Sequence, residues 1–252
     1  MELRARHRYR GGVTTTVPEV EARLSGVDWP AVDEALRERP YATLSARLTP
    51  DECAALAACW SLPSRFRSRV DMARHRFGLG EYRYFARPLP PLVAGLRRHA
   101  YPPLAAIANG WMEALRARER FPTDFAELEE RCRRAGQLEP TPLLLRYEAG
   151  GYNCLHQDIY GAVAFPLQLV ALLSRPGRDF EGGEFLLVQQ RPRAQSVAEV
   201  VRAEQGDMVV FANRHWPAVG TRGFHRASVR HGVSRVLSGV RFALGIIFHD
   251  AA

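Results

Sequence analysis

The chain has 252 residues, 46% of them hydrophobic, so it can bury a large core without disulfides or membrane support. Its formal charge of +8 arises from 35 basic side chains, all arginine, a usage typical of GC-rich coding, so the charge supports an acidic partner only weakly. The chain has no long apolar run, no signal-peptide pattern and no C-x-x-C pair among its four cysteines, which predicts a cytoplasmic protein with reduced thiols and neither a disulfide framework nor a zinc site.

The first half of the chain carries helix signals. Asp28-Trp-Pro opens a helix that runs to about Arg39, and Thr49-Pro-Asp-Glu52 is a capping box with proline at the first helical position. Further helices are expected at residues 90–99, 103–118 and 123–135, the last closed by a glycine. We therefore expect residues 1–140 to be mainly helical and packed on the core, with residues 65–87 as a candidate substrate lid.

From residue 141 onward the pattern changes to short β-rich runs separated by glycine turns. The runs are residues 143–147, 165–173, 184–189, 197–202, 208–211, 227–231 and 240–248. Helices outside many short strands are typical of an α+β fold with a double-stranded β-helix, or jelly-roll, core. The sequence therefore predicts a catalytic core over residues 141–252, forming one structural unit with the helical part.

A metal-ligand pattern lies at the start of this core. His156 and Asp158 flank Gln157 in a predicted strand, and His231 follows much later in the chain. Because residues i and i+2 of a strand point to the same face, His156 and Asp158 can converge on one ion while Gln157 turns away; Cys154 shares their parity. Two imidazoles and one carboxylate are the ligand set of mononuclear non-haem iron, which leaves positions open for a cosubstrate and O2. The pattern predicts a catalytic iron site.

The choice of the second histidine depends on the arginine that follows it. An arginine lies ten residues after His231 (Arg241) and also ten residues after His225 (Arg235). Arg235 falls inside a predicted turn at residues 232–239, whereas Arg241 opens an apolar strand. We therefore favour His231 as the ligand.

Arg241 is also placed to bind an anion. Its in-phase neighbours Ala243 and Gly245 are small and leave room for a ligand, and its planar fork suits the far carboxylate of 2-oxoglutarate. The out-of-phase side chains of the strand are expected to fill the core. Tyr147 and Asn153 are candidates to donate hydrogen bonds to the cosubstrate, and the alternative for both is a structural role.

Several motifs together resemble the prolyl-hydroxylase-type Fe(II)/2-oxoglutarate-dependent oxygenase superfamily. They are residues 146–158, 182–185, 206–211 and 231–241. Residues 66–85 and 244–250 are similar to a bacterial group of that superfamily assigned to oxidative demethylation of damaged nucleic acid. The resemblance implies Fe(II), 2-oxoglutarate and O2 as cofactors, and decarboxylation of 2-oxoglutarate coupled to hydroxylation of a substrate C–H. Halogenases of this type have a small residue where this chain has Asp158, which argues against halogenation.

The substrate class stays open between two alternatives. Alkylated-DNA repair dioxygenases tend to have a second arginine shortly after the cosubstrate arginine, and none follows Arg241. That departure favours hydroxylation of a small molecule, an amino acid in biosynthesis or a protein side chain. A binding protein without activity would have lost a metal ligand, and none is missing.

Residues 65–87 are the candidate substrate contact. Seven arginines interleave there with five aromatic side chains. Because aromatic rings stack on bases while arginines contact phosphates, the segment predicts binding of single-stranded or damaged nucleic acid. The expected contacts are Arg74, Arg76, Tyr82, Arg83 and Tyr84. The alternative is an arginine-rich loop whose aromatic rings pack on the barrel.

Overall fold

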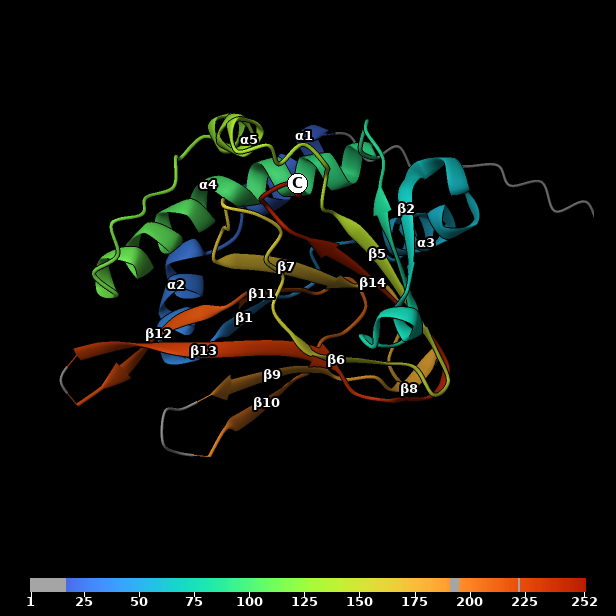
Figure 1. Ribbon diagram of the computed structural model, residues 1–252. Helices are drawn as coiled ribbons and strands as arrows, with labels where there is room; N and C mark the ends of the chain where they lie inside the picture. The colour runs from blue at the N-terminus through green and yellow to red at the C-terminus, as the bar shows by residue number, and fades with distance from the viewer. Residues whose placement is uncertain (1–16, 191–194, 222) are drawn as a thin grey trace, which may run out of the picture.

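In a computed structural model, residues 17–190, 195–221 and 223–252 are described. Two antiparallel sheets lie one above the other, and helices cover the outer face of the larger sheet (Figure 1). This confirms the predicted α+β class with a double-stranded β-helix core. None of the helices within the described ranges is long and apolar enough to cross a membrane.

The helices lie almost entirely in the first half of the chain. They are α1 Val17–Ser25, α2 Trp29–Glu38, α3 Pro50–Ala58, α4 Pro91–Ala114 and α5 Phe125–Arg134, with short 3-10 turns η1 Cys59–Ser61, η2 Pro63–Arg65 and η3 Met72–His75. The strands are β1 Tyr41–Leu44, β2 Phe66–Asp71, β3 Gly78–Leu79, β4 Glu81–Phe85, β5 Leu143–Glu148, β6 Tyr152–His156, β7 Leu167–Leu172, β8 Phe180–Gly182, β9 Phe185–Gln190, β10 Val197–Val201, β11 Met208–Ala212, β12 His215–Gly220, β13 Gly223–Val233 and β14 Val236–Ile246.

Two helices begin where their caps predict. The Thr49 hydroxyl accepts from the backbone N–H of Glu52 at 3.2 Å, and the Glu52 carboxylate accepts from the N–H of Thr49 at 2.7 Å. The Asp28 carboxylate accepts from the N–H of Ala31 at 3.0 Å and begins α2 in the same way. The capping box and the Asp28 cap are therefore confirmed.

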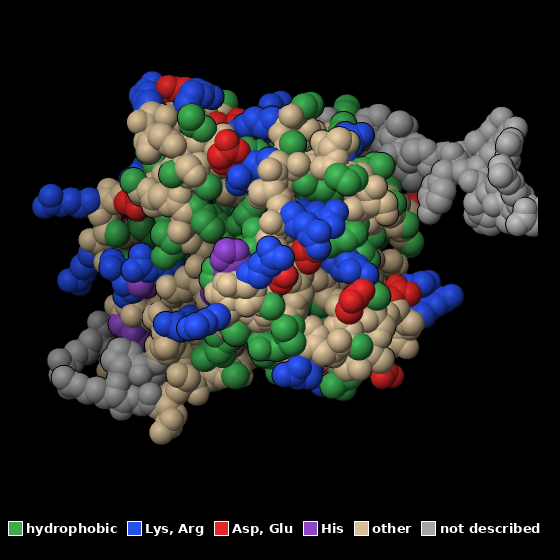
Figure 2. Space-filling view, turned by 45° about the vertical axis from the view of Figure 1, so that its right-hand side comes forward, with side chains coloured by type: hydrophobic (Ala, Val, Ile, Leu, Met, Phe, Trp, Pro, Cys, Tyr) green, Lys and Arg blue, Asp and Glu red, His purple; other side chains and the backbone are tan. Residues whose placement is uncertain are grey.

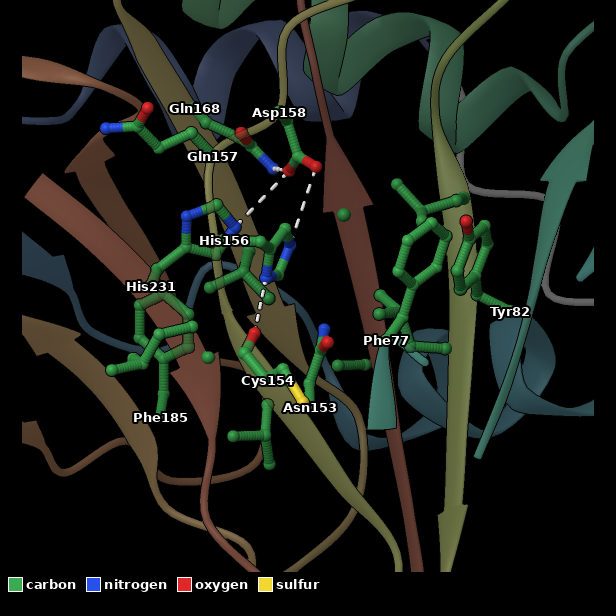
Figure 3. A pocket seen from close by; sticks show the side chains of 18 of the residues that line it. Phe77, Tyr82, Asn153, Cys154, His156, Gln157, Asp158, Gln168, Phe185 and His231 are labelled. Carbon is green, nitrogen blue, oxygen red and sulfur yellow. Dashed lines mark hydrogen bonds and ion pairs between the residues drawn. The ribbon is translucent and has the colours of Figure 1, made fainter. Parts of the chain in front are cut away.

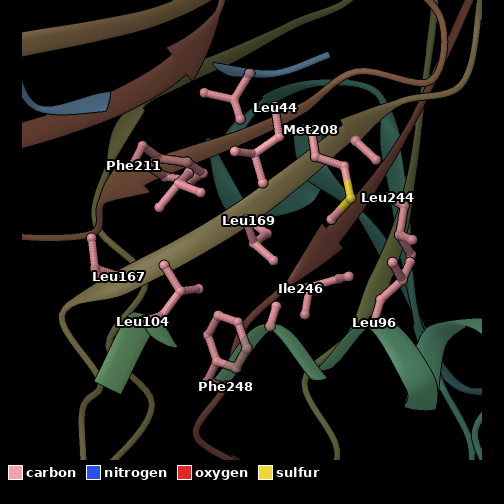
Figure 4. Packing of buried hydrophobic residues seen from close by; sticks show 14 of the residues in the cluster. Leu44, Leu96, Leu104, Leu167, Leu169, Met208, Phe211, Leu244, Ile246 and Phe248 are labelled. Atoms are coloured by element: carbon pink, nitrogen blue, oxygen red, sulfur yellow. The ribbon is translucent and has the colours of Figure 1, made fainter. Parts of the chain in front are cut away.

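The prediction of two helices at residues 90–99 and 103–118 was wrong, because α4 is one helix with Pro102 and Pro103 inside it. Its buried face continues through the prolines, since Tyr101 and Leu104 are both fully buried. Figure 4 shows side chains of this helix packed against those of the larger sheet. Packing on the sheet thus outweighs the local cost of the prolines.

The larger sheet has the strand order β1-β11-β7-β14-β5-β4-β2, and the smaller has β10-β9-β13-β6-β3, with β12 paired to β13. Each β-rich run of the second half falls on a strand, but β8 and β12 were not predicted. Strands β1 to β4 come from the part expected to be mainly helical, and three of them extend the larger sheet. Residues 65–87 therefore form largely a sheet extension, β2 to β4, beside the core.

The strand register brings distant segments together at one place between the sheets. His231 on β13 is the Cα partner of His156 on β6. On the facing sheet, Arg241 on β14 is the Cα partner of Tyr147 on β5. The predicted turn at 232–239 is shorter than expected, since β14 already begins at Val236.

Candidate metal centre and its cavity

Three side chains converge at the end of β6. Nitrogen and oxygen atoms of His156, Asp158 and His231 all lie within 4.8 Å of one another, so the three residues could hold one metal ion. The Asp158 carboxylate lies 3.5 Å from Nε2 of His156 and 3.3 Å from Nε2 of His231 (Figure 3). Two imidazole nitrogens and one carboxylate on one side of a cavity fit an iron(II) ion with open coordination positions.

The His156 ring is oriented by a hydrogen bond, and the environment of His231 favours its metal-binding form. Nδ1 of His156 lies 2.8 Å from the carbonyl oxygen of Cys154. Nδ1 donates a hydrogen bond to this oxygen when it carries the ring proton, and the lone pair on Nε2 is then free to bind a metal. Burial, and then the neighbouring His156, lower the pKa of His231. Both effects favour neutral imidazole, which is the form that binds a metal.

The Asp158 carboxylate is held on both oxygens. The Tyr160 hydroxyl donates to Oδ1 at 2.7 Å, and the Gln168 amide donates to Oδ2 at 2.8 Å. Burial alone would raise the pKa of Asp158, but its hydrogen bond with His231 and its interaction with the neighbouring His156 outweigh burial and lower that pKa. The carboxylate is therefore ionised, and its orientation is set before any metal binds.

We expect Tyr160→Phe to lower the affinity for Fe(II) by about 10-fold, because the loss of an outer hydrogen bond to a metal ligand typically costs 10- to 100-fold. Competition with a metal-sensitive dye under anaerobic conditions measures this affinity. Tyr152→Phe is the matched control, since Tyr152 lies on β6 and packs under Arg235, outside the cavity lining. Equal Fe(II) affinity in the two variants would contradict a positioning role for Tyr160.

Gln157 turns away from the metal ligands, as predicted. Its amide donates to the carbonyl of Val229 at 2.7 Å and to the hydroxyl of Ser228 at 3.2 Å. The residue between the two ligands thus ties the end of β6 to β13. This bond helps to set the distance between His156 and His231.

The ligands open into a cavity of about 340 Å³. Its wall includes Leu145, Val170 and Phe185 toward the interior, and Phe77 and Leu155 toward solvent. Figure 3 shows Phe77 and Tyr82 across the cavity from His231 and Phe185. Asp158 is the only carboxylate in the described lining, which makes the cavity suited to anions.

Arg241 lines the same cavity from β14, in phase with Ala243 and Gly245 as predicted. Its side chain is buried, and within the described residues it forms no ion pair, while its Nε has no hydrogen-bond partner. Burial lowers its pKa, although Tyr147 and Glu184 act to raise it. Gly183 lies against it with a positive φ of 63°, where a Cβ would come within 3.0 Å of Arg241 Cδ. A buried guanidinium without a counter-ion fits the carboxylate of a cosubstrate.

Tyr147 and Asn153 both line the cavity near Arg241. The Tyr147 ring lies 5.7 Å from the Arg241 guanidinium, and its hydroxyl is buried without a hydrogen bond of ordinary geometry. Burial raises the pKa of Tyr147 to about 12, against the lowering effects of Arg241 and the Asn153 side chain. The phenol is thus protonated and available as a donor.

His225 and Arg235, the alternative metal ligand and cosubstrate arginine, lie outside this cavity. His225 is exposed on β13, six residues before His231. Arg235 donates to the carbonyl of Gly150 at 2.8 Å and lies 4.8 Å from the Tyr152 ring. Neither is part of the lining, so the geometry favours His231 and Arg241.

The predicted substrate residues divide into two groups. Arg76 and Tyr82 line the cavity, with Arg76 at a left-handed turn. The others lie away from the lining: Arg74 pairs with Asp71 at 3.5 Å, Arg83 pairs with Glu81 at 2.6 Å and donates to the Trp60 carbonyl, and the Tyr84 hydroxyl donates to that of Tyr160 at 3.1 Å. For Arg83 and Tyr84, the alternative that the side chains of this segment pack within the protein therefore holds.

Sequence reasoning missed Leu155, Tyr160 and Gln168 of the site, and it counted Phe77 among the five aromatic side chains of residues 65–87 without choosing it as a substrate contact. Phe77 and Leu155 form its exposed rim, and Tyr160 and Gln168 hold Asp158. Tyr160 lies two residues after Asp158, a spacing that could have suggested it. For Gln168, a polar residue in the apolar run of β7 was the available signal.

The chain is similar to one protein family, to two further sequences and to two solved structures. Residues 80–251 match the model of the Oxygenase-NA family, described as oxygenases catalysing oxidative methylation of damaged DNA. Two uncharacterized proteins of Mycobacterium tuberculosis are each 44% identical over 168 residues, which is 67% of this chain and 72% of theirs. A prolyl-4-hydroxylase of Pseudomonas putida superposes with a TM-score of 0.53 at 17% identity, covering 86% of this chain and 96% of that one. A prolyl 4-hydroxylase structure from Phytophthora capsici gives 0.51 at 16% identity, covering 98% and 69%. The two structural likenesses concern the fold.

Proposed function

Because the chain belongs to the Oxygenase-NA family, whose fold is that of prolyl-hydroxylase-type iron(II) and 2-oxoglutarate oxygenases, we propose that it oxidises alkylated bases of nucleic acid. Membership bears out the resemblance of the sequence motifs and makes the chain an oxygenase. The observation that carries the proposal is a single cavity with three metal-binding side chains, an unpaired buried Arg241, and a basic and aromatic rim.

His156, Asp158 and His231 would hold the iron in this proposal, each through one atom. With 2-oxoglutarate and O2, bound iron(II) supplies oxidation of a C–H bond, and 2-oxoglutarate leaves as succinate and CO2. The chain's own part is to present neutral imidazoles and an ionised carboxylate on one side only. The other side faces the cavity, where cosubstrate and substrate meet.

Arg241 would bind the far carboxylate of 2-oxoglutarate through its guanidinium. Tyr147 would donate its buried hydroxyl, and Asn153 would add an amide beside it. The apolar wall of Leu145, Val170 and Phe185 excludes water from this end and strengthens the ion pair. These roles rest on the lack of any protein partner for Arg241 within the described ranges.

The rim supports a nucleic-acid base as the substrate. Phe77 is 46% exposed and stacks on His75 with the ring centroids 5.4 Å apart, and Leu155 is 40% exposed. Arg76 beside them has no ion-pair partner in the described parts of the chain. An enzyme acting on a base must take it out of the stack and hold it by aromatic and apolar contacts, with cations near the phosphates.

A hydroxylase of a small molecule, an amino acid or a protein side chain is the second candidate. After Arg241, β14 continues with Phe242, Ala243, Leu244, Gly245 and Ile246, and offers no further cation to the substrate. One assay separates the candidates: iron-loaded protein is incubated with 2-oxoglutarate and either a methylated oligonucleotide or a small-molecule set. Loss of CH2 from the oligonucleotide with release of formaldehyde supports demethylation, whereas a stable gain of one oxygen by another substrate supports hydroxylation.

We further expect Phe77→Ala to raise the KM for a methylated single-stranded oligonucleotide by about 10-fold, because stacking on an aromatic ring is worth roughly 1 to 3 kcal/mol per base. Steady-state release of formaldehyde measures this change. Leu138→Ala, a truncation of another exposed apolar side chain, outside both the cavity lining and the β12–β13 hairpin, is the control. The same KM in both variants would remove Phe77 from the proposed base contact.

A further inference from the structure

A second basic surface lies on the hairpin of β12 and β13, outside the cavity. We call Arg214, His215, Arg226 and Arg230 the hairpin surface. The three arginines are exposed, and none forms an ion pair or a side-chain hydrogen bond within the described ranges. This differs from residues 65–87, where five of the seven arginines pair with carboxylates. Charges that no protein carboxylate neutralises remain available to an outside anion.

Three members of this surface, Arg214, His215 and Arg226, lie close to one another around one hollow. Burial, and then the charges of Arg214 and Arg226, lower the pKa of His215, so both guanidinium groups act on the same ring. Nδ1 of His215 is buried and has no hydrogen-bond partner among the described residues. Beside these residues is a hollow of about 300 Å³ whose one described carboxylate, Glu119, is already paired with Arg131 at 2.7 Å. The local field is therefore positive.

The hairpin surface is joined directly to the candidate metal ligands. Gln157, which lies between His156 and Asp158, donates to the carbonyl of Val229 and to that of Arg214 at 3.4 Å. Ile159 on the same connection is part of the wall of the hollow. Toward the left of Figure 2, where the hairpin lies, arginine and histidine side chains gather with few carboxylates. A nucleic-acid strand that leaves the cavity on this side would meet the hairpin next.

We propose that the hairpin surface binds the phosphates of a single-stranded nucleic acid on one side of the base held in the cavity. The inference rests on the proposed function and names a second contact for that substrate. Arg226 and Arg230 lie four residues apart on one face of β13, about 13 Å at the usual rise, so they can contact separate phosphates. Arg76 serves the other side of the cavity mouth, and the strand then crosses the opening between two cationic anchors.

The test is the salt dependence of binding to a labelled single-stranded oligonucleotide. We expect the double variant Arg214→Gln, Arg226→Gln to bind about 10-fold more weakly at low salt. The slope of log K against log salt should shrink by about 1.4, since each lost phosphate contact removes roughly 0.7. The control is Arg98→Gln, Arg202→Gln, which removes the same charge from exposed arginines of α4 and of the residue after β10. Thermal unfolding midpoints verify that both variants are folded.

The length of the oligonucleotide distinguishes a defect at the cavity itself from the loss of a contact on the distant hairpin surface. The defect of the hairpin variant in kcat/KM, relative to the control pair, should shrink as the substrate is shortened to one methylated nucleotide. If the wild type demethylates oligonucleotides but the hairpin variant keeps the slope of the control pair, the hairpin inference fails and the proposed function stands. If the wild type neither binds nor oxidises oligonucleotides and oxidises a small molecule instead, the proposed function fails and the inference with it.

Discussion

Replacement of His156, Asp158 or His231 by alanine is expected to abolish 2-oxoglutarate turnover and to lower Fe(II) affinity by more than about 100-fold. Loss of an outer hydrogen bond already costs up to that factor, and a direct ligand contributes more. The three atoms lie within 4.8 Å of one another, so each variant leaves only two protein ligands. Anaerobic titration with Fe(II), together with succinate release, measures both effects.

The controls for this prediction come from the same strand and the same residue type. His225→Ala removes an exposed histidine of β13 and should keep Fe(II) affinity. Unfolding midpoints of the three ligand variants should stay near that of the wild type when no metal is present, because the core around α4 does not depend on them. Full Fe(II) affinity in His231→Ala, or its loss in His225→Ala, would show that the ligand assignment is wrong.

Local spacing was enough to predict much of the site. The alternation from His156 to Asp158 predicted that both would lie on one side and that Gln157 would turn away, and both hold, although β6 ends at His156 and Asp158 follows it outside the strand. The phase of Arg241 with Ala243 and Gly245 placed all three in the cavity wall. These features depend only on near neighbours in the chain, which is why sequence reasoning reached them.

Features that depend on distant pairing were not predictable in the same way. Strand β1 pairs with β11, which lies more than 160 residues later in the chain. The four residues of β1 carry no marked hydrophobic pattern that would predict a strand. The helix break expected at Pro102 and Pro103 did not occur because packing on the sheet holds α4 together.

Arginine partners form a further example. Arg83 alternates with aromatic residues as a base-binding segment would, yet it pairs with Glu81 and lies 4.0 Å above the Trp60 ring. The Trp60 contact joins η1 to β4 and cannot be read from spacing. The arginines that remain unpaired in the described part of the chain, such as Arg76, are identified only once the carboxylates are placed.

Arg241→Ala is expected to weaken 2-oxoglutarate binding by about 30- to 4000-fold while Fe(II) stays bound. Removal of one partner from a buried charge pair costs roughly 2 to 5 kcal/mol, and each 1.4 kcal/mol is a factor of ten. Arg241 is 4% exposed, and within the described residues its Nε lacks a hydrogen-bond partner, so little water is available to replace the guanidinium. Anaerobic calorimetric titration of the Fe(II)-loaded protein with 2-oxoglutarate measures the change.

Two further variants decide whether geometry or charge alone matters at this position. Arg241→Lys should recover only part of the affinity, because an ammonium group cannot form the two parallel hydrogen bonds of the guanidinium fork. Arg235→Ala should bind 2-oxoglutarate as the wild type does, since Arg235 lies outside the cavity and donates to the Gly150 carbonyl. Unchanged affinity in Arg241→Ala would assign the carboxylate to another cation, whereas a loss in Arg235→Ala would point to the turn before β14. A full recovery by lysine would mean that the site needs a positive charge and not the fork.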